Sequence, residues 1–163
     1  MNAQIVGNVG LYFVCYELSK RGWNVMPTAR NAKGIDIIAY DLTATRYIGI
    51  QVKALSKKSP VPLGNSLDKV MGDFWIIVNN LDATPGIFIL RPEEVRARAH
   101  RGVKEERVSF WLQPKSYMIP EFEMRWERLE EIQPNNKAPE PTTRPVTIPA
   151  ASGNAPSCIV AHL

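Results

Sequence analysis

Apolar positions near the start of the chain follow a helical period. Four of them are spaced i, i+3, i+4 and i+7: Leu11, Val14, Cys15 and Leu18. This spacing places the side chains on one helix face and predicts an amphipathic helix over residues 8–21, with Gly22 as its C-cap. Cys15 is then expected to be a small core residue.

Beyond Gly22 the pattern changes to short runs rich in β-branched and aromatic residues, which is typical of strands. These runs lie at residues 23–28, 35–40, 47–55, 74–78, 87–90 and 108–112. Polar residues 41–46 predict a hairpin turn, and residues 79–86 predict a second one. We expect the run at residues 108–112 to form an edge strand.

Three further segments complete the pattern. Residues 56–64 contain two prolines and a glycine and predict a loop, which is followed by one or two helical turns at residues 66–71. Proline and two glutamates at residues 92–94 favour a helix that runs to about His100. Apolar residues spaced i, i+4 and i+7 predict a last helix from about Pro120: Phe122, Trp126 and Leu129. The elements together predict an α/β fold with one mixed sheet.

Length and composition set the domain boundaries. A chain of 163 residues suits one domain, which we place at residues 1–132. Residues 133–163 are rich in proline and lack periodicity, so they predict a disordered tail. No apolar run approaches the roughly 20 residues that cross a bilayer, and the first residues do not read as a secretory signal. We therefore expect a cytoplasmic protein without a membrane partner.

Cysteine and histidine offer no metal-binding pattern. Cys15 and Cys158 are far apart in the chain, and His100 and His162 have no partner at ligand spacing. Charge is more informative, because residues 1–60 hold eight Lys/Arg against three Asp/Glu. That excess favours a polyanionic partner, although a mildly basic solvated face is the alternative interpretation.

Three polar residues interrupt the apolar strands around the first hairpin. Gln51 and Lys53 are two positions apart, so strand alternation places both on one face. If the hairpin turns at residues 43–45, the residue opposite Asp36 lies between positions 51 and 53. The pattern predicts a compact cluster of one carboxylate, one amide and one amine.

Such a cluster suits phosphodiester chemistry. Carboxylate and amide oxygens are hard ligands for Mg²⁺, with water and substrate phosphate completing the coordination. A lysine beside the metal can stabilise the developing negative charge and orient or deprotonate the attacking water. The alternative is structural: Asp36 caps a bend, and Gln51 and Lys53 are solvent-facing residues of a half-exposed sheet.

The order of helix, strand, Gly34-Ile35-Asp36 and Ile50-Gln51-Val52-Lys53 resembles the signature of the PD-(D/E)xK nuclease superfamily. The resemblance covers about residues 7–100 and is greatest to restriction-endonuclease-like proteins similar to archaeal Holliday junction resolvases. It implies an αβββαβ core and an Mg²⁺- or Mn²⁺-dependent endonuclease that acts on nucleic acid, with DNA the expected substrate. It also implies metal binding by Asp36, Gln51 and the backbone carbonyl of Val52, and a catalytic role for Lys53.

The sequence departs from that signature at two places. Gln51 stands where the family usually has a glutamate, which removes a metal-binding charge. Leu11 stands where resolvase-like members carry a glutamate on the first helix, and Glu17 is either a solvated charge or a substitute ligand. A catalytically degenerate protein that binds nucleic acid or a protein partner is therefore an alternative, as is a toxin-like or defence-associated module.

Basic residues flank the signature on the adjoining loops. They are candidates for contacts to backbone phosphates that do not recognise the base sequence: Arg30, Lys33, Lys57 and Lys58. A plain solvated surface is an equal alternative. The tryptophans lie in apolar patterns and are expected in the core rather than as base-stacking platforms: Trp23, Trp75, Trp111 and Trp126. The sequence does not decide between a monomer and a homodimer.

Overall fold

The computed structural model describes residues 1–28 and 34–131. The helical elements of these ranges are α1 (Ala3–Lys20), the 3₁₀ helix η1 (Leu67–Lys69), α2 (Pro92–Arg98), α3 (Pro114–Tyr117) and the 3₁₀ helix η2 (Trp126–Leu129). The strands are β1 (Asn24–Pro27), β2 (Ile37–Tyr40), β3 (Tyr47–Ala54), β4 (Val61–Gly64), β5 (Phe74–Asn79), β6 (Gly86–Leu90), β7 (His100–Lys104) and β8 (Arg107–Leu112). The tail predicted at residues 133–163 lies outside the described ranges.

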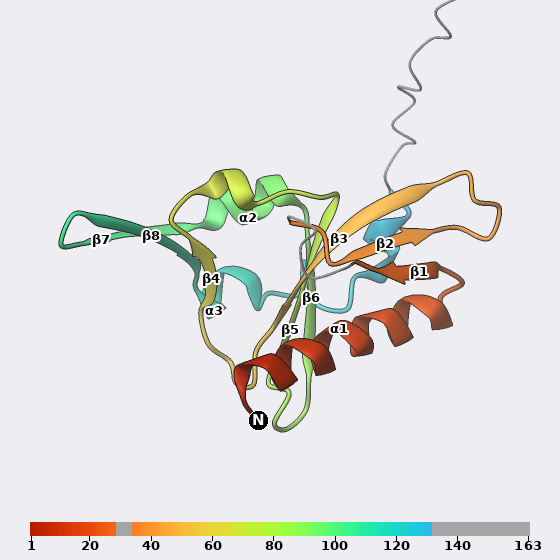
Figure 1. Cartoon of the computed structure of the whole chain (residues 1–163), viewed down its shortest axis with the longest axis horizontal. Helices are drawn as coiled ribbons and strands as arrows, with labels where there is room; N and C mark the ends of the chain where they lie inside the picture. The colour runs from red at the N-terminus through yellow and green to blue at the C-terminus, as the bar shows by residue number, and fades with distance from the viewer. Residues whose placement is uncertain (29–33, 132–163) are drawn as a thin grey trace, which may run out of the picture.

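The main sheet has five strands in the order β1-β2-β3-β5-β6. The first three strands form an antiparallel meander, β5 runs parallel to β3, and β6 pairs antiparallel with β5. Both predicted hairpins are confirmed, and the fold is α/β with a mixed sheet. Figure 1 shows α1 lying along this sheet.

Helix α1 begins five residues before the predicted start, because the side chain of Asn2 caps it by accepting from the N–H of Ile5 at 2.9 Å. At the other end the C-cap residue is Arg21, and the predicted cap Gly22 follows it with φ +84°, the left-handed conformation that a glycine after a helix adopts. Gly10 lets the helix approach β3, because a Cβ there would lie 2.3 Å from the Cβ of Ala54. None of the helices in the described ranges has the length and apolar character needed to cross a membrane.

A second sheet corrects the prediction of a single sheet. It has three strands in the order β4-β8-β7, so β8 is its central strand rather than an edge. Strand β4 occupies part of the predicted loop at residues 56–64. Pro62 is tolerated there because β4 is an edge strand, where a missing N–H costs no ladder bond. The helix predicted to reach His100 ends at Arg98, and His100 begins β7.

The predicted last helix is confirmed only in its second half, where Trp126 and Leu129 lie in the short 3₁₀ helix η2, and the residues from Pro120 to Arg125 are not helical. Its apolar residues are buried as expected, but residues 122–124 run beside β6 instead of coiling. The N–H of Ile89 donates to the carbonyl of Phe122 at 2.8 Å, and the N–H of Met124 donates to Ile87 at 2.9 Å. Met124 has φ +55°, which ends any helical path. Backbone pairing with an open strand edge therefore replaced the local helical preference.

The core lies on both faces of the main sheet. One cluster joins α1 to the sheet through residues such as Val14, Leu18, Ile50 and Ile76. The other joins the opposite face to the second sheet, through residues that include Trp75, Ile77, Val61 and Leu112. The predicted core role is confirmed for Trp23, Trp75 and Trp126, whereas Trp111 is half-buried.

Candidate functional site

Asp36 lies directly before β2, at the point where that strand stops pairing with β3. The register pairs Ile37 with Ile50, which places Asp36 level with Gln51. The backbone N–H of Asp36 donates to the carbonyl of Ile50 at 2.8 Å. Its carboxylate reaches one residue further and accepts from the N–H of Val52 at 2.7 Å. The side chain of Asp36 thus makes the hydrogen bond to β3 that the backbone of a longer β2 would make.

This geometry also orients the Val52 carbonyl. The N–H and C=O of one strand residue leave the strand on the same edge. The N–H of Val52 points to the side of Asp36, so its carbonyl points to that side as well. A carboxylate and a peptide carbonyl therefore lie at one strand edge, beyond the last residue of β2.

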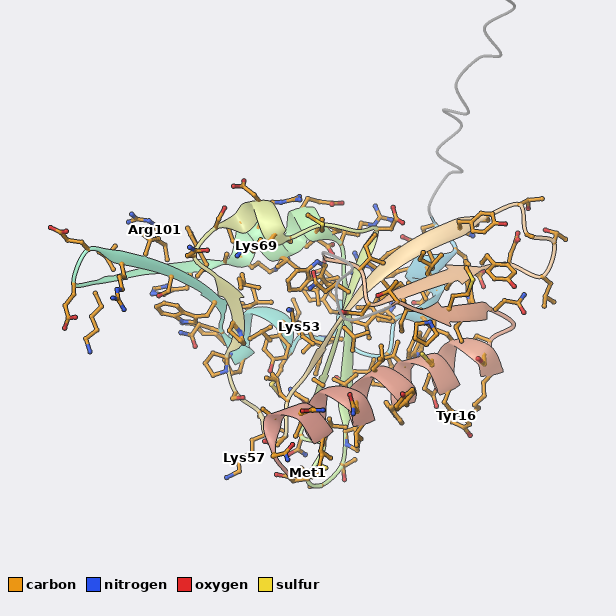
Figure 2. The ribbon with its side chains drawn as sticks, in the orientation of Figure 1. Met1, Tyr16, Lys53, Lys57, Lys69 and Arg101 are labelled. Carbon is orange, nitrogen blue, oxygen red and sulfur yellow. The ribbon has the colours of Figure 1, made fainter. Side chains whose placement is uncertain are left out.

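Gln51 and Lys53 project to the opposite side of the sheet from Ile50, as strand alternation predicts. They line a cavity of about 500 Å³ together with Trp75 and residues of β4 and η1. The Lys53 ammonium lies 5.1 Å from the centre of the Trp75 ring. Lys69 lines the same cavity and was not predicted from the sequence, because its loop carries no motif. Figure 2 labels Lys53 in the middle of the molecule and Lys69 above it.

Burial of the Lys53 side chain lowers the pKa of its amine, because a low-dielectric surrounding disfavours the charged form. The negative charge of Asp36 acts in the opposite direction and raises that pKa. The carboxylate and the amine therefore interact electrostatically. A lysine with a lowered pKa can exchange a proton more readily near neutral pH than an exposed one.

The amide oxygen Oε1 of Gln51 is buried and has no hydrogen-bond partner among the described residues. Leaving such an acceptor unpaired costs roughly 1–3 kcal/mol. The sequence pattern identified Gln51 as a candidate but could not predict its unpaired oxygen.

Asp36 and Val52 line a different hollow, of about 210 Å³, with Gly7 and Leu11 of α1. The structure therefore brings Gln51 and Lys53 together in one cavity and places Asp36 in a separate hollow beside α1. Leu11 faces the carboxylate as the resemblance implies, without supplying a second one. Glu17 is not solvated: it is buried and paired with Arg21 at 2.5 Å.

The available donors suit a hard cation but carry little charge. Asp36 offers the carboxylate oxygen that Val52 does not use, and Val52 offers a neutral carbonyl oxygen at the same strand edge, whereas the buried amide oxygen of Gln51 belongs to the other cavity. Within residues 1–28 and 34–131 no three His, Cys, Asp or Glu side chains gather as a metal-binding group. One carboxylate is consistent with weak binding that substrate phosphate would strengthen.

The predicted phosphate-contact residues are only partly described. Lys57 and Lys58 are exposed in the loop after β3, as that role requires, while Arg30 and Lys33 lie outside the described ranges. Figure 2 shows Lys57 well away from Lys53, at the end of the molecule where α1 begins. Comparison with known families, with curated proteins and with solved structures finds no match for the chain.

Proposed function

We propose that this protein is a nuclease-like hydrolase of nucleic-acid phosphodiester bonds, with DNA as the expected substrate and Mg²⁺ or Mn²⁺ as cofactor. The observation that carries the proposal is the hydrogen bond from Val52 to Asp36. It holds the Asp36 carboxylate at the edge of β3, at the residue that stands between Gln51 and Lys53 in the signature. The likeness to the PD-(D/E)xK superfamily and its αβββαβ core is part of the same proposal.

Each residue has a defined task in this proposal. Asp36 and the Val52 carbonyl would hold the cation, and Gln51 would add a neutral oxygen. When bound, the cation would supply Lewis acidity toward the scissile phosphate. Lys53 takes a proton from the attacking water when its amine is neutral, and stabilises the charge on the phosphoryl oxygens when it is protonated. Lys69 adds positive charge to the same cavity.

A cleavage assay with matched variants tests this assignment. Labelled duplex DNA, single-stranded DNA and RNA are incubated with Mn²⁺ and the wild-type protein, Asp36→Asn or Lys53→Met. Asp73→Asn is the control, because Asp73 accepts from the N–H of Gly49 at 2.6 Å and so makes a similar strand-edge bond outside the site. We expect cleavage by wild type and control and at least a hundredfold loss in both site variants. Equal cleavage by all four proteins would overturn the assignment.

A second candidate function is binding of nucleic acid without cleavage. The observation that favours it is the single carboxylate of the site, since Gly7 and Leu11 face Asp36 where a second acid would be needed. Retention of DNA on a filter with no cleavage by the wild-type protein under any divalent cation would favour this function over hydrolysis.

A further inference from the structure

The cavity that contains Lys53 combines apolar walls with two ammonium groups. It lies between the two sheets, and its walls belong to β4, to β5 and to the segment after η1: Pro62, Leu63, Gly64, Met71 and Trp75. Lys53 and Lys69 are the charged side chains among the described residues that line it. We call this space the Lys53–Lys69 cavity. A ligand that suits it has an anionic group and an apolar body.

The lack of a carboxylate separates this cavity from two others of similar size. The cavity beside α2, of about 490 Å³, is lined by three carboxylates, and the cavity beside Trp23, of about 540 Å³, is lined by two. A carboxylate in the wall repels an anionic ligand and competes with it for the cations. Among the described residues that line the Lys53–Lys69 cavity there is no aspartate or glutamate, so a ligand anion meets two cations without a competing acid.

Trp75 forms a fixed part of the apolar wall. Its indole Nε1 donates to the backbone carbonyl of Met71 at 3.1 Å, which holds the ring in place. The Lys53 ammonium lies 5.1 Å from the centre of this ring, so the apolar wall and the cation adjoin each other. Because the single polar atom of the indole is already bonded, the wall can contact a flat apolar ligand but cannot select its polar groups. Such a wall suits binding that tolerates different bases.

We propose that the Lys53–Lys69 cavity holds one unpaired nucleotide of a nucleic-acid strand, with its base against the apolar walls and a phosphate beside the two ammonium groups. A nucleotide fits this chemistry because its phosphate is the anion and every base has a flat apolar face. The cavity measures about 500 Å³, within the range of roughly 300–1,000 Å³ in which small-molecule sites fall.

The inference rests on the proposed function and names the form of the substrate. Strand β3 contributes Gln51 and Lys53 to the cavity and Val52 to the Asp36 hollow, so adjoining residues of one strand serve both places. A base that is paired and stacked within a duplex must leave the stack before it can enter a cavity. We therefore expect single-stranded or locally unpaired substrates to be preferred over a continuous duplex.

Two matched oligomers test whether a base occupies the cavity. One is an oligothymidylate of about eight nucleotides, and the other has the same length and charge but carries an abasic tetrahydrofuran sugar at each position. Fluorescence anisotropy in EDTA measures binding without cleavage. We expect the wild-type protein to bind the thymidylate oligomer about tenfold more tightly or better. Equal affinity for the two oligomers would overturn the proposal.

Cavity variants show whether that preference arises at this place. Met71→Trp enlarges a half-exposed side chain of the wall and should make the two oligomers bind equally. Met26→Trp is the control, because Met26 is 45% exposed in β1, and it should keep the wild-type preference. A folded Met71→Trp protein with the full preference would place the base elsewhere. If circular dichroism shows that this variant is unfolded, Met71→Phe replaces it with the same two outcomes.

The phosphate contact is tested separately. Lys69→Ala removes an exposed cation of the cavity and should weaken the binding of both oligomers about threefold or more, whereas Lys115→Ala should not. Binding that is unchanged in Lys69→Ala would contradict the role of this lysine in the proposal.

Failure of this inference and failure of the proposed hydrolysis give different results. A wild-type protein that cleaves DNA with Mn²⁺ but binds the two oligomers equally contradicts the nucleotide cavity alone. A wild-type protein that prefers the thymidylate oligomer but cleaves nothing under any divalent cation supports the cavity and contradicts hydrolysis alone.

Discussion

The carboxylate of Asp36 accepts a hydrogen bond from the backbone N–H of Val52, 2.7 Å away. This bond joins a residue that precedes β2 to Val52 of β3, at a point where β3 is no longer paired with β2. It places a negative charge beside the amine of Lys53, which extends from the next position of the strand. The charge of Asp36 therefore raises the pKa of Lys53, against the larger lowering effect of burial.

The first prediction concerns this coupling. Asp36→Asn removes the charge that raises the Lys53 pKa and leaves the larger effect of burial, so that pKa should fall further below its ordinary value. An NMR titration of the lysine side chains measures the change directly. Asp73→Asn serves as the control and should leave the Lys53 titration where it is. An unchanged or higher Lys53 pKa in Asp36→Asn would contradict the described geometry.

The second prediction concerns stability. The Lys53 pKa is lower in the folded chain than in the unfolded one, so between the folded value and about 10.5 the unfolded chain holds a proton that the folded chain has released. The free energy of unfolding should therefore rise with pH across that window. Lys53→Met should abolish this rise and stabilise the protein at pH 7 by about 1 kcal/mol. Urea unfolding between pH 7 and 10 measures both effects, with the exposed Lys115→Met as control.

The third prediction concerns the amide in the site. Gln51→Glu adds a second carboxylate, so Mn²⁺ should bind about tenfold more tightly or better. Without metal the new charge should lower the free energy of unfolding by about 1 kcal/mol, because Lys53 and Lys69 line the same cavity and offset part of the cost of burying it. Thermal unfolding with and without Mn²⁺ should show a larger metal-induced rise in Tm for this variant than for wild type. The exposed Gln4→Glu should show no such gain.

The fourth prediction uses the open position at Gly7. A Cβ built there has no neighbour within 4 Å, and the residue lines the hollow that contains Asp36. Gly7→Glu should raise stability by about 0.5–1 kcal/mol through helix propensity and also tighten Mn²⁺ binding. Gly7→Gln separates the two effects, because it should give the same stability without the tighter metal binding. Calorimetric titration that shows equal Mn²⁺ affinity for both variants would count against a metal position beside Asp36.

The fifth prediction concerns phosphate contacts. Lys57→Ala combined with Lys58→Ala removes two exposed cations, so nucleic-acid binding should weaken. The slope of the logarithm of the binding constant against the logarithm of the salt concentration should become shallower by about two units. Fluorescence anisotropy of labelled DNA across a salt series measures the slope. Lys115→Ala is the control. A slope that is identical in wild type and double variant would place the phosphate contacts elsewhere.

Local sequence patterns were sufficient for the elements whose partners are close in the chain. The helix that contains Leu18, the β2–β3 hairpin and the β5–β6 hairpin follow from periodicity and turn residues. The alternation of Gln51 and Lys53 against Ile50 also follows from strand geometry alone. In each case the residues that decide the structure lie within a few positions of each other.

The patterns were insufficient where a distant partner decides the structure. Pro62 suggested a loop, but its segment pairs with Trp111 of β8, far along the chain. Phe122 lies in a helical apolar pattern, but its carbonyl is held by Ile89 of β6. For the same reason the sequence could not reveal Lys69, because it reaches the site only through the packing of the second sheet.

The pairing of β4 with β8 also affects the order in which the chain can fold during synthesis. A nascent chain that has reached Leu90 contains every strand of the main sheet, but not the strand that covers Val61 and Leu63. These two residues are 0% and 5% exposed in the finished fold, and until Leu112 has been made they remain uncovered. Exposed apolar residues on an unpaired strand are binding sites for chaperones and starting points for aggregation. Ribosomes that stall within residues 91–111 should therefore release chains that precipitate or are degraded, whereas chains that extend past Leu112 complete both sheets.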